Sequence, residues 1–146
     1  MPRPITFDTW NIQPACLPTS CEDPCLSSEQ AIITNTGFTN TGLLSGAIRT
    51  RKAAVTLIPP EECQETYNQS LPGRIHSNMV CAKVTGFNWI PGSAEIGGSP
   101  LTCYKDNAFT LEGIWSREFT KIFEYQVISF VRVCSVLDWI KRITAN

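Results

Sequence analysis

Residues 97–116 read Gly-Gly-Ser-Pro-Leu-Thr-Cys-Tyr-Lys-Asp-Asn-Ala-Phe-Thr-Leu-Glu-Gly-Ile-Trp-Ser, and this stretch says most about the fold. It contains two short runs of mainly apolar and β-branched residues, each of which is typical of a β-strand. Similar short runs occur along the rest of the chain, with turn-forming residues between them. The sequence therefore predicts six strands, at residues 30–34, 47–58, 79–83, 101–104, 110–115 and 125–133.

Prolines and glycines mark the predicted turns between these strands. The turn signals are Asn35-Thr36-Gly37, Asn40-Thr41-Gly42, Pro59-Pro60, Leu71-Pro72-Gly73 and Pro91-Gly92. The periodicity then changes, because Val136, Leu137, Ile140 and Ile143 recur at helical spacing with charged residues between them. Residues 134–145 are therefore predicted to form an amphipathic helix. Strands followed by one helix favour an all-β barrel or sandwich.

The composition is that of one globular domain with its own core. Hydrophobic residues make up 42% of the 146 residues, charged residues make up 17%, and the net charge is -1. This charge does not indicate a nucleic acid or an anionic membrane surface as a partner. The longest apolar stretch is interrupted by Arg132 and Asp138 and is shorter than the about 20 apolar residues of a membrane span. We expect no cofactor.

Seven cysteines in a chain of this size indicate an oxidising compartment. The first residues contain no apolar segment of the kind found in signal peptides. We therefore expect a secreted protein, extracellular or in the lumen of a secretory vesicle, whose leader lies on a longer precursor. Cys21 and Cys25 have the spacing of a metal knuckle, but there is no second pair and no nearby histidine, so no metal site is predicted.

Several segments, read in order from about residue 5 to residue 143, resemble consecutive landmarks of the second barrel of the trypsin-like serine proteases. These segments are Ile12–Pro18, Ala31–Gly37, Val55–Ile58 with Cys63, Met79–Ala82, Gly97–Cys103, Leu111–Ser116, Arg132–Val133 and Asp138–Ile140. The resemblance implies a six-stranded antiparallel Greek-key barrel with a C-terminal α-helix. It also implies that residues 1–146 form a single domain and that the N-terminal barrel of the family is absent.

The resemblance implies two disulfides, Cys63–Cys81 and Cys21–Cys134. Cys16 is then left over. In two-chain relatives the equivalent cysteine is bonded to a segment from another part of the protein, so a bond to another segment or chain is one expectation. The alternative is a buried free thiol.

Two further bridges of the family are altered in this sequence. Ser93 and Lys121 occupy both positions of the bridge beside the active site, and loss of both partners is expected because a single orphan thiol invites mispairing. Ala31 replaces one end of another bridge and leaves Cys103. Cys25, in a slightly longer loop, is the candidate partner for Cys103.

The catalytic positions of the family are also altered. An alignment on Pro100-Leu101 without gaps places Gly97 at the position of the nucleophile, and glycine has no side chain that could attack a carbonyl. Ile96 stands where the family has the aspartate that binds the new N-terminus after activation. Glu95 replaces the glycine whose N–H group donates to the oxyanion. The interpretation is that no catalytic residue is present.

The primary specificity pocket differs from that of the family as well. Pro91 falls near the pocket floor, where trypsin has an aspartate. Arg117 and Glu118 replace the tryptophan and glycine of the substrate-binding strand. Ile128 replaces a glycine that keeps the pocket open, so its side chain is expected to fill the pocket.

Candidates for the remaining catalytic groups are few. The family's histidine and aspartate motifs belong to the first barrel, and the single histidine of this chain, His76, lies in a surface-like loop. Ser93 and Ser99 flank the nucleophile position, but neither has an aligned base, and serine is a poor nucleophile without one. We therefore predict that this chain is not an enzyme.

The leading interpretation is a non-catalytic serine protease homologue, or pseudoprotease, that acts as a protein-binding or scaffold module in a larger assembly. The alternative is a fragment or isoform of a trypsin-like serine endopeptidase that needs the missing N-terminal barrel. A protein partner is expected to cover the exposed face of the barrel, with Phe7, Trp10 and Ile12 at the seam. A small-molecule substrate is not expected.

Two surface motifs remain. Asn68-Gln69-Ser70 is an N-glycosylation sequence, and its alternative reading is an unused tripeptide. Residues 49–52 form a small basic cluster, which is either a solvated strand end or a protein-binding patch.

Overall fold

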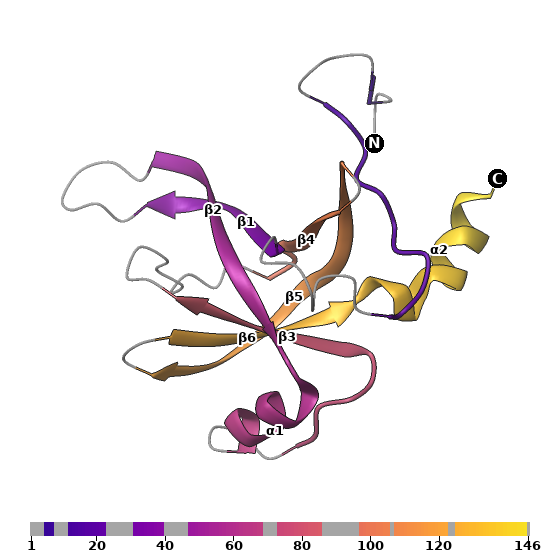
Figure 1. Cartoon of the computed structure of the whole chain (residues 1–146). Helices are drawn as coiled ribbons and strands as arrows, with labels where there is room; N and C mark the ends of the chain where they lie inside the picture. The colour runs from indigo at the N-terminus through magenta and orange to yellow at the C-terminus, as the bar shows by residue number, and fades with distance from the viewer. Residues whose placement is uncertain are drawn as a thin grey trace.

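The computed structural model describes residues 5–7, 12–22, 31–39, 47–68, 73–85, 97–105, 107–122 and 125–145. Within these residues, six antiparallel strands close into a barrel, and two α-helices lie outside it (Figure 1). The predicted all-β antiparallel barrel with a C-terminal helix is therefore confirmed. The strands are β1 (Ala31–Thr39), β2 (Ala47–Ile58), β3 (Met79–Thr85), β4 (Pro100–Lys105), β5 (Ala108–Ile122) and β6 (Tyr125–Arg132).

The strand order around the barrel is β1-β2-β3-β6-β5-β4, with β4 pairing back to β1. The connection from β3 to β4 is thus the one that joins two strands that are not neighbours. β4 starts directly after the Gly97–Ser99 segment, and β5 returns beside it as an antiparallel partner. This pairing places residues 97–99 next to the middle of β5.

The largest differences between the predicted and the observed strands are in β1 and β5. Asn35-Thr36-Gly37 is not a turn but part of β1, where Thr36 pairs with Thr50 and their hydroxyl oxygens lie 2.9 Å apart. β5 continues beyond residue 115 to Ile122, with register shifts between Trp115 and Arg117 and between Glu118 and Thr120. Pairing with a neighbouring strand supplies backbone partners that local turn propensity does not take into account.

The barrel core is a single cluster of apolar side chains contributed by all six strands. Phe130 of β6 is fully buried near its centre, and its ring lies edge-on to the ring of Trp115, with the ring centroids 5.9 Å apart. The buried members of this cluster are Ala31, Ile33, Val55, Ala82, Val84, Leu101, Cys103, Trp115, Ile128 and Phe130. This packing holds β4, β5 and β6 in a fixed arrangement.

Helix α1 (Pro60–Asn68) was not predicted, because Pro59-Pro60 was interpreted only as a turn. Proline is tolerated at the first helical position, and the carboxylates of Glu61 and Glu62 in the first turn favour the positive end of the helix dipole. Tyr67 buries its ring at the end of the helix. Because proline can start a helix as well as end a strand, the local sequence did not distinguish a turn at Pro59-Pro60 from the start of a helix.

A second, smaller apolar cluster joins α1 to the outside of the barrel. Its buried members are Ile58, Cys63, Cys81 and Val127. An ion pair between Glu62 of α1 and Lys83 of β3 adds a polar link at the edge of this contact. Helix α1 is therefore attached to β3 by packing, by charge and by a disulfide.

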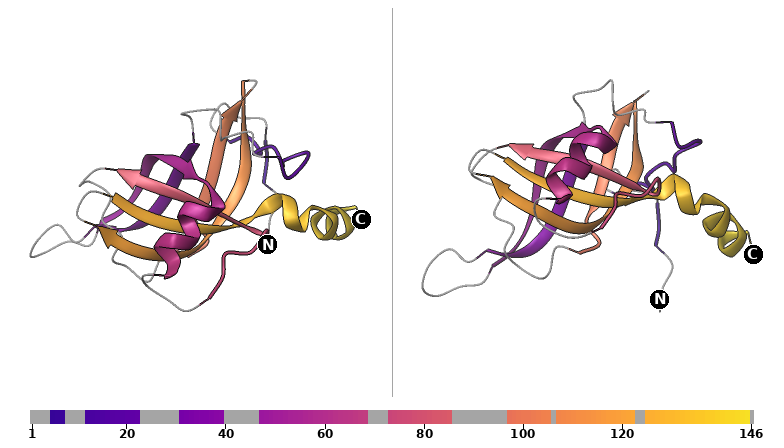
Figure 2. Two further views of the ribbon diagram at one scale, coloured as in Figure 1. Left: turned by 60° about the horizontal axis from the view of Figure 1, so that its bottom comes forward. Right: turned by 90° about the horizontal axis from the view of Figure 1, so that it is seen from below.

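The C-terminal segment starts as a 3-10 helix, η1 (Val133–Val136), and continues as α2 (Leu137–Thr144). Leu137 is buried, but most of α2 projects away from the barrel wall, as the two rotated views show (Figure 2). In the part of the chain that the structure describes, no helix is long and apolar enough to cross a membrane.

Candidate functional site

The candidate site is built around a turn of two glycines, Gly97 and Gly98, which we call the 97–98 turn. Both residues are exposed, and Gly98 has φ +89°, a conformation that favours glycine. A Cβ atom added at Gly97 would meet no other atom within 4 Å. The position that aligns with the family's nucleophile therefore faces open space in this chain.

The 97–98 turn is fixed by backbone hydrogen bonds to β5. The Gly98 amide donates to the Trp115 carbonyl at 3.1 Å, and the Trp115 amide donates to the Ser99 carbonyl at 2.8 Å. Trp115 is buried in the barrel core, so this pairing connects the turn to the rigid part of the molecule. The turn and the middle of β5 thus form one continuous surface element.

Two serine residues beside this turn have different environments. Ser99 is only 8% exposed, so its side chain is largely withdrawn from solvent. Ser116 directly follows Trp115 on β5, at the register shift, and is exposed. Sequence reasoning did not consider Ser116 as a candidate hydroxyl, and the pairing of Trp115 with Gly98 and Ser99 is the structural signal that brings it to the site.

Residues of the predicted specificity pocket lie on β5 and β6. Arg117 is exposed, and its carbonyl lies 3.5 Å from the Ser129 hydroxyl, which donates to it. Ile128 is completely buried and belongs to the barrel core, and its backbone partner on β5 is Glu118. The Ile128 side chain thus lies inside the barrel, at the strand position that pairs with Glu118.

Several predicted site residues cannot be placed. Pro91, Ser93, Glu95 and Ile96 lie outside the described residues, as does Cys25. His76 is described: it is exposed in the segment before β3, and its carbonyl accepts a hydrogen bond from the Met79 amide at 2.9 Å. This places His76 in a surface turn.

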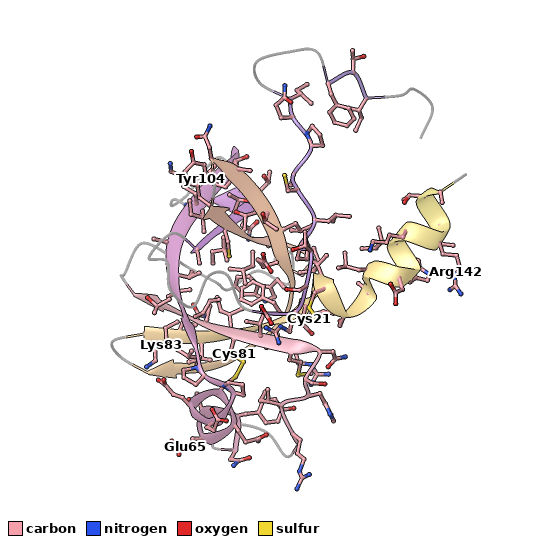
Figure 3. The ribbon with its side chains drawn as sticks, turned by 45° about the vertical axis from the view of Figure 1, so that its right-hand side comes forward. Cys21, Glu65, Cys81, Lys83, Tyr104 and Arg142 are labelled. Atoms are coloured by element: carbon pink, nitrogen blue, oxygen red, sulfur yellow. A yellow bond between two sulfur atoms is a disulfide. The ribbon has the colours of Figure 1, made fainter. Side chains whose placement is uncertain are left out.

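Disulfides hold the outer parts of the chain to the barrel (Figure 3). Cys21 is bonded to Cys134 in η1, and Cys63 of α1 is bonded to Cys81 of β3. These are the two pairs that the resemblance implied. Cys103 is also disulfide-bonded in the structure.

Cys16 carries a free and exposed thiol, so the expectation of a buried thiol at this position was wrong. Its backbone is paired with the edge of β5: the Cys16 amide donates to the Phe109 carbonyl at 2.9 Å, and the Leu111 amide donates to the Cys16 carbonyl at 2.8 Å. The segment before β1 is therefore held along the wall of the barrel.

The described residues contain no group of three or more histidine, cysteine or acidic side chains that could hold a metal ion. Cys21, one member of the spacing that resembles a metal knuckle, is used in a disulfide with Cys134.

A closed six-stranded antiparallel barrel with a C-terminal helix, in the part of the chain that the structure describes, fits the fold of the trypsin-like serine proteases. Comparisons with known proteins agree with this class. The family model described as Trypsin matches residues 2–140. Human (Homo sapiens) kallikrein-11 is 28% identical over 148 residues, which cover 100% of this chain and 48% of that protein.

The chain belongs to the trypsin family, because the family model covers nearly all of it. It spans about half the length of kallikrein-11, since the aligned region is 48% of that protein. It therefore corresponds to part of a trypsin-like protease domain.

The prediction that this chain is not an enzyme is contradicted by these comparisons. Both the family and the kallikrein relative point to a protease, and neither indicates an inactive homologue. The prediction depended mainly on a gapless alignment on Pro100-Leu101 that assigns Gly97 to the position of the nucleophile. It is overturned by the match to a family of proteases and by the similarity to kallikrein-11.

Proposed function

We propose that this chain is the second-barrel half of a trypsin-like serine endopeptidase domain and that it acts on peptide bonds together with a first barrel. The single observation that carries this proposal is the family match over residues 2–140 of a chain that covers 48% of kallikrein-11. In the family, the histidine and the aspartate come from the first barrel, so the reaction needs both halves. This was the alternative interpretation of the sequence.

An exposed apolar surface supports a protein partner of this kind. Trp139 and Ile143 on α2 are each 57% exposed, although α2 is an amphipathic helix. Ile5, Phe7 and Ile12, in the stretch before β1, are also exposed, and Trp10 lies outside the described residues. Large exposed apolar side chains are typical of an interface, and the first barrel is the partner that we propose for them.

A second candidate function, protein binding, is favoured by the same exposed helix. Projection of α2 away from the barrel (Figure 2) leaves Val136, Trp139 and Ile143 available to any partner with a complementary apolar groove. Binding through this helix does not depend on a catalytic hydroxyl. It is therefore tested by association alone, whereas the endopeptidase function is tested by turnover.

We further propose that the protein is secreted, into the extracellular space or the lumen of a secretory vesicle. Disulfides Cys21–Cys134 and Cys63–Cys81 support this location, because such bonds persist in oxidising compartments and are rare in the cytosol. The similarity of the chain to kallikrein-11 is compatible with this location.

The test is reconstitution of the full chain with a first barrel, for example that of kallikrein-11, in a secretory expression system. Hydrolysis of a panel of fluorogenic peptides is measured for the chain alone, for the first barrel alone and for the two together. We expect turnover from the pair only, because each half alone lacks part of the catalytic constellation. A well-formed pair that hydrolyses none of the peptides would contradict the endopeptidase proposal and leave protein binding as the better account.

Three serine variants identify the attacking hydroxyl in the reconstituted pair. Ser93→Ala, Ser99→Ala and Ser116→Ala are made one at a time, with Ser77→Ala in an exposed turn as the matched control. Loss of the nucleophile is expected to lower kcat by several orders of magnitude, whereas the control leaves it unchanged. Equal activity of all four variants would show that the hydrolysis does not come from a serine of the candidate site.

A further inference from the structure

The sequence Asn68-Gln69-Ser70 is the only Asn-X-Ser or Asn-X-Thr sequence in the chain, and the proposed endopeptidase function makes no use of it. Such sequences are the acceptors of N-linked oligosaccharides in secreted proteins, and glycans need exposed positions because they are bulky. Asn68 is the last residue of α1 and is exposed. Its position at the end of a surface helix therefore meets the steric requirement.

Gln64, one helical turn before Asn68, orients the Asn68 side chain. Gln64 Nε2 donates to Asn68 Oδ1 at 2.8 Å and to the Gly73 carbonyl at 3.3 Å, while Gln64 Oε1 accepts from the Ile75 amide at 2.7 Å. The acceptor atom of the Asn68 amide is therefore engaged, and its Nδ2 atom donates to none of the described residues. A glycosylated asparagine keeps Oδ1 as an acceptor, so the bond to Gln64 is compatible with modification.

A hollow lies directly beside Asn68. It is an open depression of the surface with a volume of about 510 Å³. Gly73, one of its lining residues, lies against the Tyr67 ring, since a Cβ atom added at Gly73 would lie 2.8 Å from the Tyr67 hydroxyl oxygen. The lining residues are Gln64, Asn68, Gly73, Arg74 and Ile75, which offer amide, guanidinium and carbonyl groups to the hydroxyls of a sugar.

We propose that Asn68 carries an N-linked oligosaccharide and that its first sugar rests over this hollow. In the transfer, Asn68 Nδ2 forms a bond to the anomeric carbon of an oligosaccharide carried on a lipid diphosphate. The bond between that carbon and the diphosphate oxygen breaks, the lipid diphosphate leaves with the electron pair, and Nδ2 releases one proton. The proposal depends on the proposed secretory route but not on endopeptidase activity.

The place of α1 in the fold keeps such a glycan away from the proposed partner surface. Helix α1 packs on β3 through the cluster around Cys63 and Cys81, whereas α2 leaves the barrel on another side (Figures 1 and 3). Glu65 on α1 and Arg142 on α2 are well separated in Figure 3. A glycan on Asn68 is therefore expected to leave association through α2 unaffected.

The first experiment expresses the full chain behind a secretory leader in mammalian cells and measures its intact mass. We expect a mass above that of the polypeptide, which peptide N-glycosidase F in heavy-oxygen water removes while it leaves a heavy-oxygen aspartate at position 68. Asn68→Gln and Ser70→Ala are each expected to abolish the added mass, while Asn78→Gln, an exposed asparagine outside such a sequence, keeps it. A secreted, disulfide-bonded chain with the bare polypeptide mass would overturn the proposal, whatever its proteolytic activity.

The second experiment tests whether the first sugar lies over the hollow. The glycan is trimmed enzymatically to a single N-acetylglucosamine, and backbone hydrogen exchange is compared with that of the fully deglycosylated chain. We expect slower exchange at residues 73–75, with residues 50–53 of β2 unchanged as the control. Equal exchange at residues 73–75 in the two forms would show that the sugar projects into solvent instead.

Discussion

Gly113 in β5 lies close to Phe130 of β6 and Leu101 of β4, two buried residues of the barrel core. A Cβ atom added at this position would lie 2.8 Å from Phe130 Cβ and 3.4 Å from Leu101 Cβ, so neither neighbour could move without disturbing the core. We expect Gly113→Ala to lower the free energy of unfolding by about 1–3 kcal/mol. Urea unfolding followed by tryptophan fluorescence measures this change.

Gly97→Ala is the matched control for that substitution. Gly97 is exposed and its added Cβ atom would contact nothing within 4 Å, so the free energy of unfolding is expected to change by about 0.5 kcal/mol or less. If both variants lost the same stability, the close approach of β5 to Phe130 would be wrong. Gly113→Ala thus measures the close packing of β5 against Phe130, and Gly97→Ala measures the effect of the same substitution at an exposed position.

At the scale of the elements, two disulfides close loops of very different length. Cys63–Cys81 spans a sequence separation of 18, and Cys21–Cys134 spans 113. Because a longer loop loses more entropy in the unfolded chain, replacing both cysteines by alanine is expected to cost about 3 kcal/mol for the first pair and about 5 kcal/mol for the second. Denaturant titration of the two double variants measures which of them loses more stability.

If loss of the Cys63–Cys81 bond lowered the free energy of unfolding as much as loss of the Cys21–Cys134 bond, or more, packing around α1 would contribute more than loop closure. Cys63 and Cys81 are both buried in the cluster with Ile58 and Val127, so this contribution is measurable separately. The variant Ile58→Ala with both disulfides intact measures the packing, and we expect it to cost about 2–5 kcal/mol.

Sequence patterns predicted the elements with strong local signals and missed those that depend on neighbouring strands. The strand at 47–58 was predicted with the bounds that β2 has, and Pro59-Pro60 mark its C-terminal end. β5 was predicted too short, since its far half is stabilised by pairing with β6 rather than by its own pattern. Helix α1 was missed because Pro60 is a legitimate first helical residue.

For the candidate site, the resemblance assigned Gly97 to the nucleophile position, but it did not predict the turn at residues 97–98 or the residues beside it in space. Gly97 and Ser99 were identified by alignment along the chain. Ser116 was not identified, because only the hydrogen bonds of Trp115 with Gly98 and Ser99 bring it to the same surface. Enzymatic activity was judged wrongly because the assignment of Gly97 to the nucleophile position was taken to exclude a protease, whereas the family match points to one.

At the scale of the whole molecule, α2 is the element expected to contact the first barrel. Trp139 is 57% exposed, so its removal leaves the isolated chain as stable as before. In the reconstituted pair, Trp139→Ala is expected to weaken association by about 2 kcal/mol or more, or at least about 30-fold in Kd, because buried tryptophans dominate interface energies. Analytical ultracentrifugation or calorimetry measures the Kd.

Lys141→Ala, an exposed residue of the same helix, is the control, with an expected change within about 1 kcal/mol. Equal affinity for wild type and Trp139→Ala would exclude α2 from the interface. Association would then have to use the exposed stretch before β1, where Phe7 and Ile12 lie.

The central claim is that this chain is one half of a working serine endopeptidase, and active-site labelling tests it most directly. The chain is incubated with a fluorophosphonate probe alone and after assembly with a first barrel, and the labelled residue is mapped by mass spectrometry. We predict stoichiometric labelling of one serine of this chain in the assembled domain and none in the chain alone. An assembled, correctly disulfide-bonded domain that takes up no probe would contradict the claim.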